Sequence, residues 1–163
     1  MGKKVTLGLI GLGGRGIGLL KTVFLHHEDV EFAAVCDVYE DRCQEAAELI
    51  EKSGRPRPQT TLDYKEILKM DAVDAVILCT SWENHLNLAI EFMEAGKYVG
   101  CEVGGAYTVQ ECWKIVDAYE RTHVPVMLLE NCVYGRDEMM VSHMSEQGVL
   151  GTIVHCEGGY KHD

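Results

Sequence analysis

The stretch VTLGLIGLGGRG, residues 5–16, decides the fold. Its first seven residues form an apolar run of strand length, and the rest fits the pattern G-x-G-x-x-G. A segment with helical periodicity follows it, and the acid Asp37 ends the next apolar run about 20 residues later. A strand, a glycine-rich turn, a helix and a later acid are the signature of a dinucleotide-binding βαβ unit.

The glycines of this motif have separate tasks. Gly11 permits the tight turn, Gly13 lets the backbone approach a pyrophosphate, and Gly16 allows the helix to pack closely on the strand. The free N–H groups and the dipole at the start of the helix attract phosphate oxygens. We therefore predict that these three glycines, together with Gly14 and Arg15, bind the phosphates of the cofactor.

Asp37 predicts which dinucleotide is bound. A carboxylate at the end of the second strand accepts hydrogen bonds from the ribose hydroxyls and repels a 2′-phosphate, so NAD is favoured over NADP. Arg42 offers an alternative, because an arginine near this position can accept NADP. We place Arg42 instead on the solvated face of the following helix.

Apolar runs of strand length alternate with helical segments along the chain. The expected strands are residues 5–11, 30–37, 73–80, 98–102, 125–131 and 151–160, and the expected helices include 40–52, 84–96, 108–122 and 137–147. Pro56 and Pro58 predict a loop over 53–60. Fully apolar strands between helices indicate an α/β fold, a Rossmann-type doubly wound parallel sheet covered on both faces.

Two spacings resemble capping boxes at helix starts, Asp63 with Glu66 and Thr108 with Glu111. Each pair places an N-cap side chain three residues before a glutamate. A short helix is therefore expected to begin at Asp63, and a helix that runs to about residue 122 is expected to begin at Thr108.

The composition changes after residue 131, where Gly, Met and His become more frequent. We predict an NAD-binding Rossmann domain over 1–131. Residues 132–163 are then the beginning of a C-terminal substrate and oligomerisation domain, an α/β domain that is mostly missing from this chain. A strand at 151–160 would lack a partner, which favours a homo-oligomer.

Charge and composition exclude several classes of protein. The 15 Lys and Arg against 26 Asp and Glu give a formal charge of −11, which argues against a nucleic-acid partner. No apolar run approaches the roughly 20 residues of a membrane span. Seven cysteines without C-x-x-C spacing indicate reduced thiols in a cytoplasmic protein. The histidines show no metal-ligand spacing, so no metal is predicted.

Polar side chains follow three of the predicted strands. Because ligands of open α/β sheets bind at the carboxyl ends of the strands, these side chains are expected to converge beside the nicotinamide. The candidates are Thr80, Ser81, Trp82, His85, Glu102, Asn131 and Tyr134. Structural alternatives remain: a helix cap for Glu102, a hydrogen-bonded helix-start histidine for His85, and packing for Trp82 and Tyr134.

The segments GLGGRG, AVCDV, TSWENH, AIEFMEAGKYVGCE and LLEN resemble the Gfo/Idh/MocA family. The resemblance implies an NAD-dependent oxidoreductase acting on a sugar or polyol hydroxyl, with substrate contacts and oligomer interfaces in a C-terminal domain. That family usually carries Glu-Lys-Pro where this chain has Glu102-Val103-Gly104, and the missing lysine assists proton transfer. Valine cannot relay a proton, so such chemistry needs another base here.

A narrower resemblance accounts for some of these departures. WENH, AGKYVGCEV, ECWKIVDAYERT, MLLENCVYGRDEMM and GYKHD are similar to glycoside hydrolase family 109, which includes NAD-dependent α-N-acetylgalactosaminidases. Those enzymes oxidise a sugar hydroxyl transiently, eliminate the aglycone, add water and reduce the sugar again. The resemblance implies that Tyr134 is the catalytic base, that Glu102 orients the nicotinamide or sugar, and that His162 is an acid/base group.

Three functions therefore stay open: sugar oxidoreduction, redox-neutral glycoside cleavage, and NAD binding without catalysis. The first is the main prediction. The 163 residues by themselves are expected to be inactive, because most of the substrate-binding domain is absent.

Overall fold

The computed structural model describes residues 4–159. The chain divides into two compact units, one ending at Leu129 and the other beginning at Glu130. The first unit contains the whole sheet, and the second contains a single helix, α6 (Arg136–Glu146).

Six parallel strands form the sheet of the first unit. They are β1 (Val5–Ile10), β2 (Val30–Cys36), β3 (Gln59–Thr61), β4 (Ala75–Leu78), β5 (Tyr98–Cys101) and β6 (Val126–Leu128). Their order in the sheet is β3-β2-β1-β4-β5-β6, and every pair of neighbours runs parallel. The chain reverses its direction of growth between β1 and β4, so ligands are expected there. The predicted Rossmann-type sheet is confirmed.

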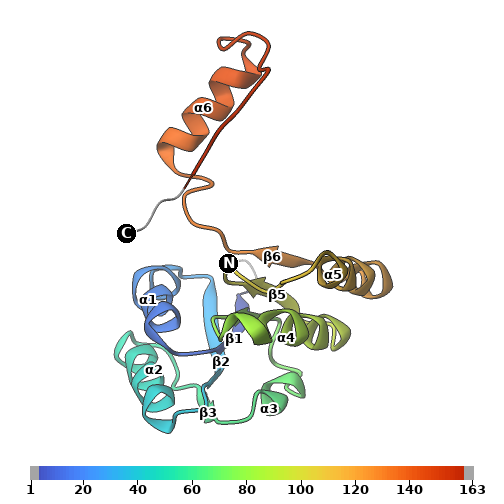
Figure 1. Ribbon diagram of the computed structural model, residues 1–163. Coiled ribbons are helices and arrows are strands. Elements are labelled where there is room, and N and C mark those ends of the chain that lie inside the picture. Colours follow the sequence, from blue (N-terminus) through green and yellow to red (C-terminus); the bar gives the residue numbers. More distant parts are fainter. Residues whose placement is uncertain (1–3, 160–163) are drawn as a thin grey trace. The chain divides into compact units, whose positions relative to one another are not determined.

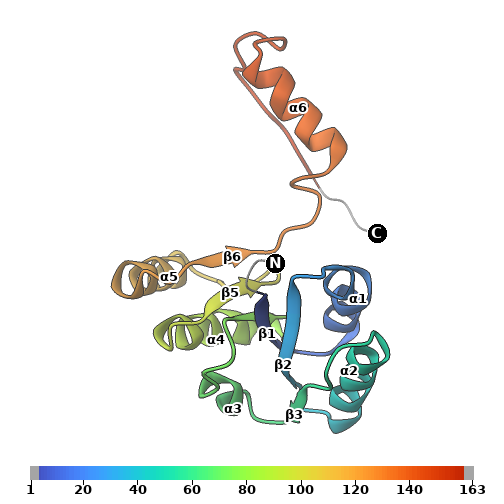
Figure 2. The same cartoon turned by 180° about the vertical axis from the view of Figure 1, so that it is seen from behind.

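Helices cover both faces of this sheet (Figures 1 and 2). One face carries α1 (Gly14–Thr22) and α2 (Glu40–Lys52), with a 3₁₀ turn over Phe24–His26 after α1. The other carries α3 (Tyr64–Leu68), α4 (Trp82–Glu94) and α5 (Val109–Thr122).

Successive side chains along a strand point to opposite faces of the sheet, so one strand contributes to the apolar layers on both faces. Leu7 and Leu9 of β1 pack in the α1/α2 layer, whereas Ile10 packs in the layer of Phe92 and Met93 from α4.

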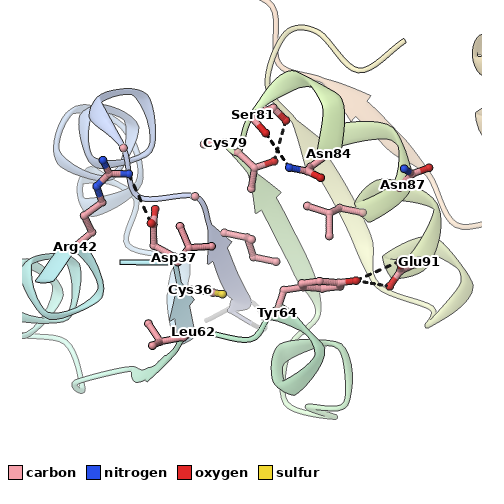
Figure 3. A pocket seen from close by; sticks show the side chains of 16 residues that line it. Cys36, Asp37, Arg42, Leu62, Tyr64, Cys79, Ser81, Asn84, Asn87 and Glu91 are labelled. Atoms are coloured by element: carbon pink, nitrogen blue, oxygen red, sulfur yellow. Dashed lines mark hydrogen bonds and ion pairs between the residues drawn. The ribbon is translucent and has the colours of Figure 1, made fainter. Parts of the chain in front are cut away.

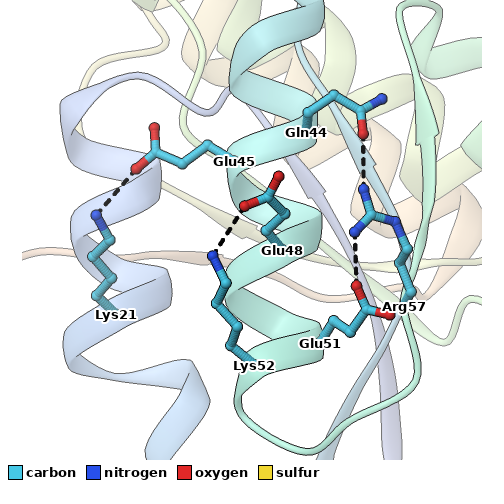
Figure 4. Close-up of polar contacts among 7 residues, drawn as sticks. All are labelled: Lys21, Gln44, Glu45, Glu48, Glu51, Lys52 and Arg57. Carbon is cyan, nitrogen blue, oxygen red and sulfur yellow. Dashed lines mark hydrogen bonds and ion pairs between the residues drawn. The ribbon is translucent and has the colours of Figure 1, made fainter.

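Surface polar contacts tie the α1/α2 layer together at its outer side (Figure 4). Lys21 of α1 donates to Glu45 of α2 at 3.1 Å. Arg57 donates to Glu51 at 2.8 Å and to Gln44 at 2.8 Å, which fastens the segment before β3 onto α2. Exposed ion pairs stabilise a fold only slightly, so the apolar layers carry the stability of this unit.

Several predicted boundaries differ from the structure. Residues 59–60 of the predicted loop belong to β3, a short edge strand that pairs Cys36 with Thr61. Helix α4 begins two residues earlier than predicted, at Trp82. Thr108 and Glu111 form the predicted capping box. The Asp63 side chain instead accepts from the backbone N–H of Lys65 at 2.9 Å, so the predicted box with Glu66 does not form.

The predicted strand over 151–160 is wrong for its described part, residues 151–159, which is irregular. A strand needs a neighbour that completes its hydrogen-bond ladder. Among the described residues, none of the strands pairs with this segment. The prediction of a homo-oligomer therefore loses this support and keeps that of the family resemblance, which implies oligomer interfaces in a C-terminal domain.

In the part of the chain that the structure describes, no helix has both the length and the apolar character to cross a membrane.

Candidate functional site

A pocket of about 590 Å³ lies where the carboxyl ends of β1, β2 and β4 meet the β3–α3 connection and α4 (Figure 3). This position is the point where the strand order reverses, as expected for an open α/β sheet. The lining residues are Ile10, Gly11, Gly13, Cys36, Asp37, Val38, Arg42, Leu62, Tyr64, Cys79, Thr80, Ser81, Asn84, Asn87, Leu88 and Glu91.

The glycine-rich turn brings backbone close to backbone. Gly11 has φ +89°, and a Cβ there would lie 2.5 Å from the carbonyl of Cys79. A Cβ on Gly16 would lie 2.0 Å from the carbonyl oxygen of Gly11, so this contact requires glycine. Gly13 and Gly14 differ, because a Cβ on Gly13 would meet only Arg42 at 3.8 Å and one on Gly14 would meet nothing within 4 Å.

Asp37 follows β2 and lines the same pocket with only 7% of its surface exposed. Its Oδ2 accepts from the backbone N–H of Leu12 at 2.6 Å, and its Oδ1 accepts from Tyr39 N–H at 3.1 Å. The backbone N–H of Asp37 in turn donates to the thiol of Cys43 at 3.2 Å. The carboxylate is thus fixed against the glycine-rich turn, with acceptor capacity left for a ligand.

Arg42 lies beside Asp37 and lines the pocket, although the sequence placed it on the solvated face of the helix. Its Nη1 is 3.6 Å from Asp37 Oδ1, and its guanidinium stacks 4.4 Å from the centre of the Tyr39 ring. The side chain remains 43% exposed. The sequence missed this placement because the first turn of α2 faces both water and the pocket.

The β4–α4 connection contributes the opposite wall. Thr80 and Ser81 line the pocket, and Asn84 Nδ2 donates to Ser81 Oγ at 2.8 Å. Cys79 directly follows β4, and burial raises the pKa of its thiol to about 12. The thiol is therefore protonated at neutral pH and is not a nucleophile.

Arg15 and Glu102 form an ion pair outside the residues that line the pocket. Arg15 Nη2 donates to Glu102 Oε1 at 2.7 Å, and this bond raises the pKa of the guanidinium. Glu102 is 5% exposed and follows β5, so the arginine reaches across the end of β4. Arg15 was predicted to bind phosphate, whereas here its side chain holds a buried carboxylate.

His85 and Trp82, at the start of α4, also lie outside the lining. His85 is 1% exposed, and its Nε2 lies 3.0 Å from the carbonyl oxygen of Thr80. Its Nδ1 is buried, and the described residues offer it no hydrogen-bond partner. Trp82 is 57% exposed and covers Gly104, where a Cβ would lie 2.5 Å from the indole. Packing is therefore the role that the geometry gives Trp82.

The remaining predicted residues belong to the second unit or lie beyond the described chain. Asn131 follows β6, and its carbonyl oxygen accepts from Val133 N–H at 2.8 Å. Tyr134 is 76% exposed. His162 lies outside the described residues.

Sequence reasoning missed the far end of the pocket, formed by Tyr64 and residues of α4. A signal was present, because Asn84, Asn87 and Glu91 recur at helical spacing in the segment WENHLNLAIEFME.

The pocket fits a dinucleotide. Its volume lies within the range of about 300–1,000 Å³ for small-molecule sites. The opening above Gly13 leaves room for a phosphate, and Asp37 offers carboxylate oxygens in the same cavity. Over residues 4–159, no three His, Cys, Asp or Glu side chains gather as ligands of a metal ion would.

Two similar proteins are named for glycoside hydrolysis. A protein of Shewanella sp. (strain ANA-3) called glycosyl hydrolase family 109 protein 1 is 44% identical, over 98% of this chain and 35% of that protein. An alpha-N-acetylgalactosaminidase of Shewanella oneidensis is 43% identical with the same coverage. This chain thus spans about a third of the length of these relatives.

Solved structures share the fold. An NAD-binding protein from Listeria innocua superimposes with a TM-score of 0.73 at 29% identity, covering 91% of this chain and 40% of that one. Myo-inositol 2-dehydrogenase from Lactobacillus plantarum gives a TM-score of 0.80 at 19% identity, covering 93% and 44%.

The sequence model of the Gfo/Idh/MocA family, described as an oxidoreductase family with an NAD-binding Rossmann fold, matches residues 5–129. This range covers all six strands and every residue that lines the pocket. The cofactor class predicted from the glycine motif and Asp37 is the one that the family binds. The chain belongs to the Gfo/Idh/MocA oxidoreductase family.

Proposed function

We propose that the pocket binds NAD in preference to NADP. The observation that carries this proposal is the buried carboxylate of Asp37, in the same pocket as Gly11 and Gly13. Phosphates over Gly13 would place the adenosine ribose at Asp37, where a 2′-phosphate meets negative charge. Arg42 would not reverse this preference, because its guanidinium already lies 3.6 Å from Asp37.

Titration calorimetry of the 163-residue chain with NAD and NADP tests this preference. We expect NAD to bind at least about tenfold more tightly, which corresponds to roughly 1.4 kcal/mol. Asp37→Asn should narrow the difference in affinity between NAD and NADP, since it removes the negative charge at this position and keeps a hydrogen-bond acceptor. Tighter binding of NADP to the unaltered chain would contradict the proposal.

We propose that a protein that contains this chain and is as long as its relatives oxidises or reduces a sugar or polyol hydroxyl. Bound NAD would accept the hydride from the carbon that carries the hydroxyl. Glu102, held by Arg15, is proposed to orient the nicotinamide or the sugar. Tyr134 is proposed as the base, because Val103 cannot relay a proton, and His162 as an acid/base group.

Redox-neutral cleavage of glycosides is the second candidate. The relatives at 43–44% identity that are named for glycoside hydrolysis favour it, and so does the absent lysine at Val103. In that reaction the hydride returns to the sugar, so NAD is regenerated within each turnover. A non-catalytic NAD-binding module is the third candidate.

One reaction trace separates the three. A protein as long as the relatives is mixed with NAD and an N-acetylgalactosaminide that has a chromogenic aglycone. The absorbance of the released aglycone and that of NADH are recorded together. Aglycone without net NADH supports the hydrolase. NADH formed from free sugars, with no aglycone released, supports the dehydrogenase. NAD binding without either product supports the binding module.

We also propose that the protein is cytoplasmic, that a sugar is its partner and that it forms a homo-oligomer. Sedimentation of a protein as long as the relatives tests the homo-oligomer, and a monomer at micromolar concentration would contradict it.

A further inference from the structure

The pocket has a polar end that the contacts assigned above do not use. It consists of Tyr64, the first residue of α3, and Glu91, in the third turn of α4. The Tyr64 hydroxyl donates to the Glu91 carboxylate, 3.0 Å from Oε2 and 3.3 Å from Oε1. Figure 3 shows this pair on the side of the pocket opposite Asp37 and Arg42.

The pair is held in place before any ligand arrives. The Tyr64 ring packs on the buried Phe92 ring, with the centroids 6.2 Å apart and the planes at 58°. Burial raises the pKa of Tyr64, and the bond to Glu91 raises it further, so the hydroxyl keeps its proton and acts as the donor. A carboxylate has about four acceptor sites, and one phenol proton leaves most of them for a ligand.

The rest of the pocket suits a flat heterocycle. With the adenosine ribose at Asp37 and the phosphates over Gly13, the adenine attached to that ribose falls in the rest of this pocket. Leu62 and Leu88 offer apolar surface to its faces, and the Tyr64–Glu91 pair meets its edge. An acceptor at this edge selects a base that presents an N–H donor.

We propose that Glu91, oriented by Tyr64, reads the adenine of NAD by accepting a hydrogen bond from its 6-amino group. This inference rests on the NAD site proposed above. A purine with hydrogen in place of the 6-amino group offers the carboxylate no N–H donor at this position. The pair is thus a specificity determinant for the base, separate from Asp37, which acts on the ribose.

Nicotinamide purine dinucleotide tests the inference, because it carries hydrogen in place of the 6-amino group of NAD and leaves N1 unprotonated, so it lacks the proposed donor. In titration calorimetry, the unaltered chain should bind NAD at least about tenfold more tightly than this analogue. Glu91→Gln should reduce the ratio to below about threefold, since a neutral amide oxygen accepts the hydrogen bond of the 6-amino group less strongly than a carboxylate does. Tyr64→Phe keeps the ring on Phe92, frees the carboxylate to rotate, and should also narrow the ratio.

Glu94→Gln is the matched control on the same helix. Glu94 is exposed and pairs with Arg121 at 2.7 Å, away from the pocket, so this variant should keep the ratio of the unaltered chain. Equal affinity of the unaltered chain for the two dinucleotides would overturn the inference and leave the NAD site standing. Binding of neither would overturn both. If Glu91→Gln and Tyr64→Phe lower the melting temperature and leave the ratio unchanged, the pair is structural and the inference is wrong.

Discussion

At the scale of single residues, Gly13 and Gly16 are both part of the motif but are glycine for different reasons. A Cβ on Gly16 would lie 2.0 Å from the Gly11 carbonyl oxygen, so the fold itself excludes a side chain there. Gly13 has an ordinary φ of −68°, and a Cβ would meet only Arg42 at 3.8 Å. Only a bound ligand gives a reason for glycine at position 13.

This difference predicts opposite phenotypes for two alanine variants. Gly13→Ala should fold normally and lose about tenfold or more in NAD affinity, because the methyl group occupies the space of a phosphate. Gly16→Ala should lose about 3 kcal/mol of unfolding free energy through overpacking. Urea unfolding and calorimetry measure the two quantities. Gly13→Ala with unchanged affinity would show that the phosphates lie elsewhere.

The sequence could predict those parts of the pocket whose chemistry lies in one contiguous motif. Gly11 and Gly13 in the turn, and Asp37 at a fixed spacing, line the pocket as the motif suggests. The engagement of Arg15 with Glu102 needs knowledge that β4 lies between β1 and β5, which a linear motif does not contain. Tyr64 and Glu91 come from two helices that only the folded chain brings together.

At the scale of elements, Lys97 joins the start of β5 to the connection between α3 and β4. The residue is 6% exposed, and its ammonium donates to the carbonyl oxygens of Met70 at 2.5 Å and Val73 at 3.1 Å. The Met70 carbonyl oxygen also accepts from the backbone N–H of Val73 at 3.2 Å, so the ammonium adds a charged donor to an existing turn. A buried lysine is therefore a structural clamp here.

Lys97→Met should destabilise the first unit by about 2–3 kcal/mol, because it leaves two carbonyl oxygens without their charged donor. Chemical unfolding followed by circular dichroism measures this loss. Lys69→Met provides the control, since Lys69 is exposed in the same connection and should shift stability by less than about 0.5 kcal/mol. Equal losses of unfolding free energy in the two variants would contradict this structural role of Lys97.

Elements with a strong periodic pattern were predictable, whereas elements that depend on a neighbour were not. The apolar runs at β1 and β4 identified buried central strands. Strand β3 is three residues long and exists because Thr61 pairs with Cys36 of β2, which its own polar sequence QTT does not indicate. The segment 151–159 has the opposite problem, with an apolar sequence and no strand beside it among the described residues.

At the scale of the whole molecule, buried thiols make the fold sensitive to alkali. Burial raises the pKa of Cys36 and Cys79 to about 12 and that of Cys101 to about 11, from the ordinary value of 9.0. The unfolded chain therefore loses these protons near pH 9 while the folded chain keeps them. Stability from this source is fully present below pH 9 and is lost as the pH rises toward 11–12.

We therefore expect the unfolding free energy to fall between pH 8 and pH 10 by about 1 kcal/mol for each of the three thiols. Urea unfolding at the two pH values, with a reductant present, measures the fall. Cys101→Ala should make it smaller by the share of one thiol, because one titrating group has been removed. Cys112→Ala should leave it unchanged, since Cys112 is exposed and is not one of the buried thiols. An equal fall in all three proteins would mean that other groups govern the alkaline limit, and the buried thiols would then be ordinary packing residues.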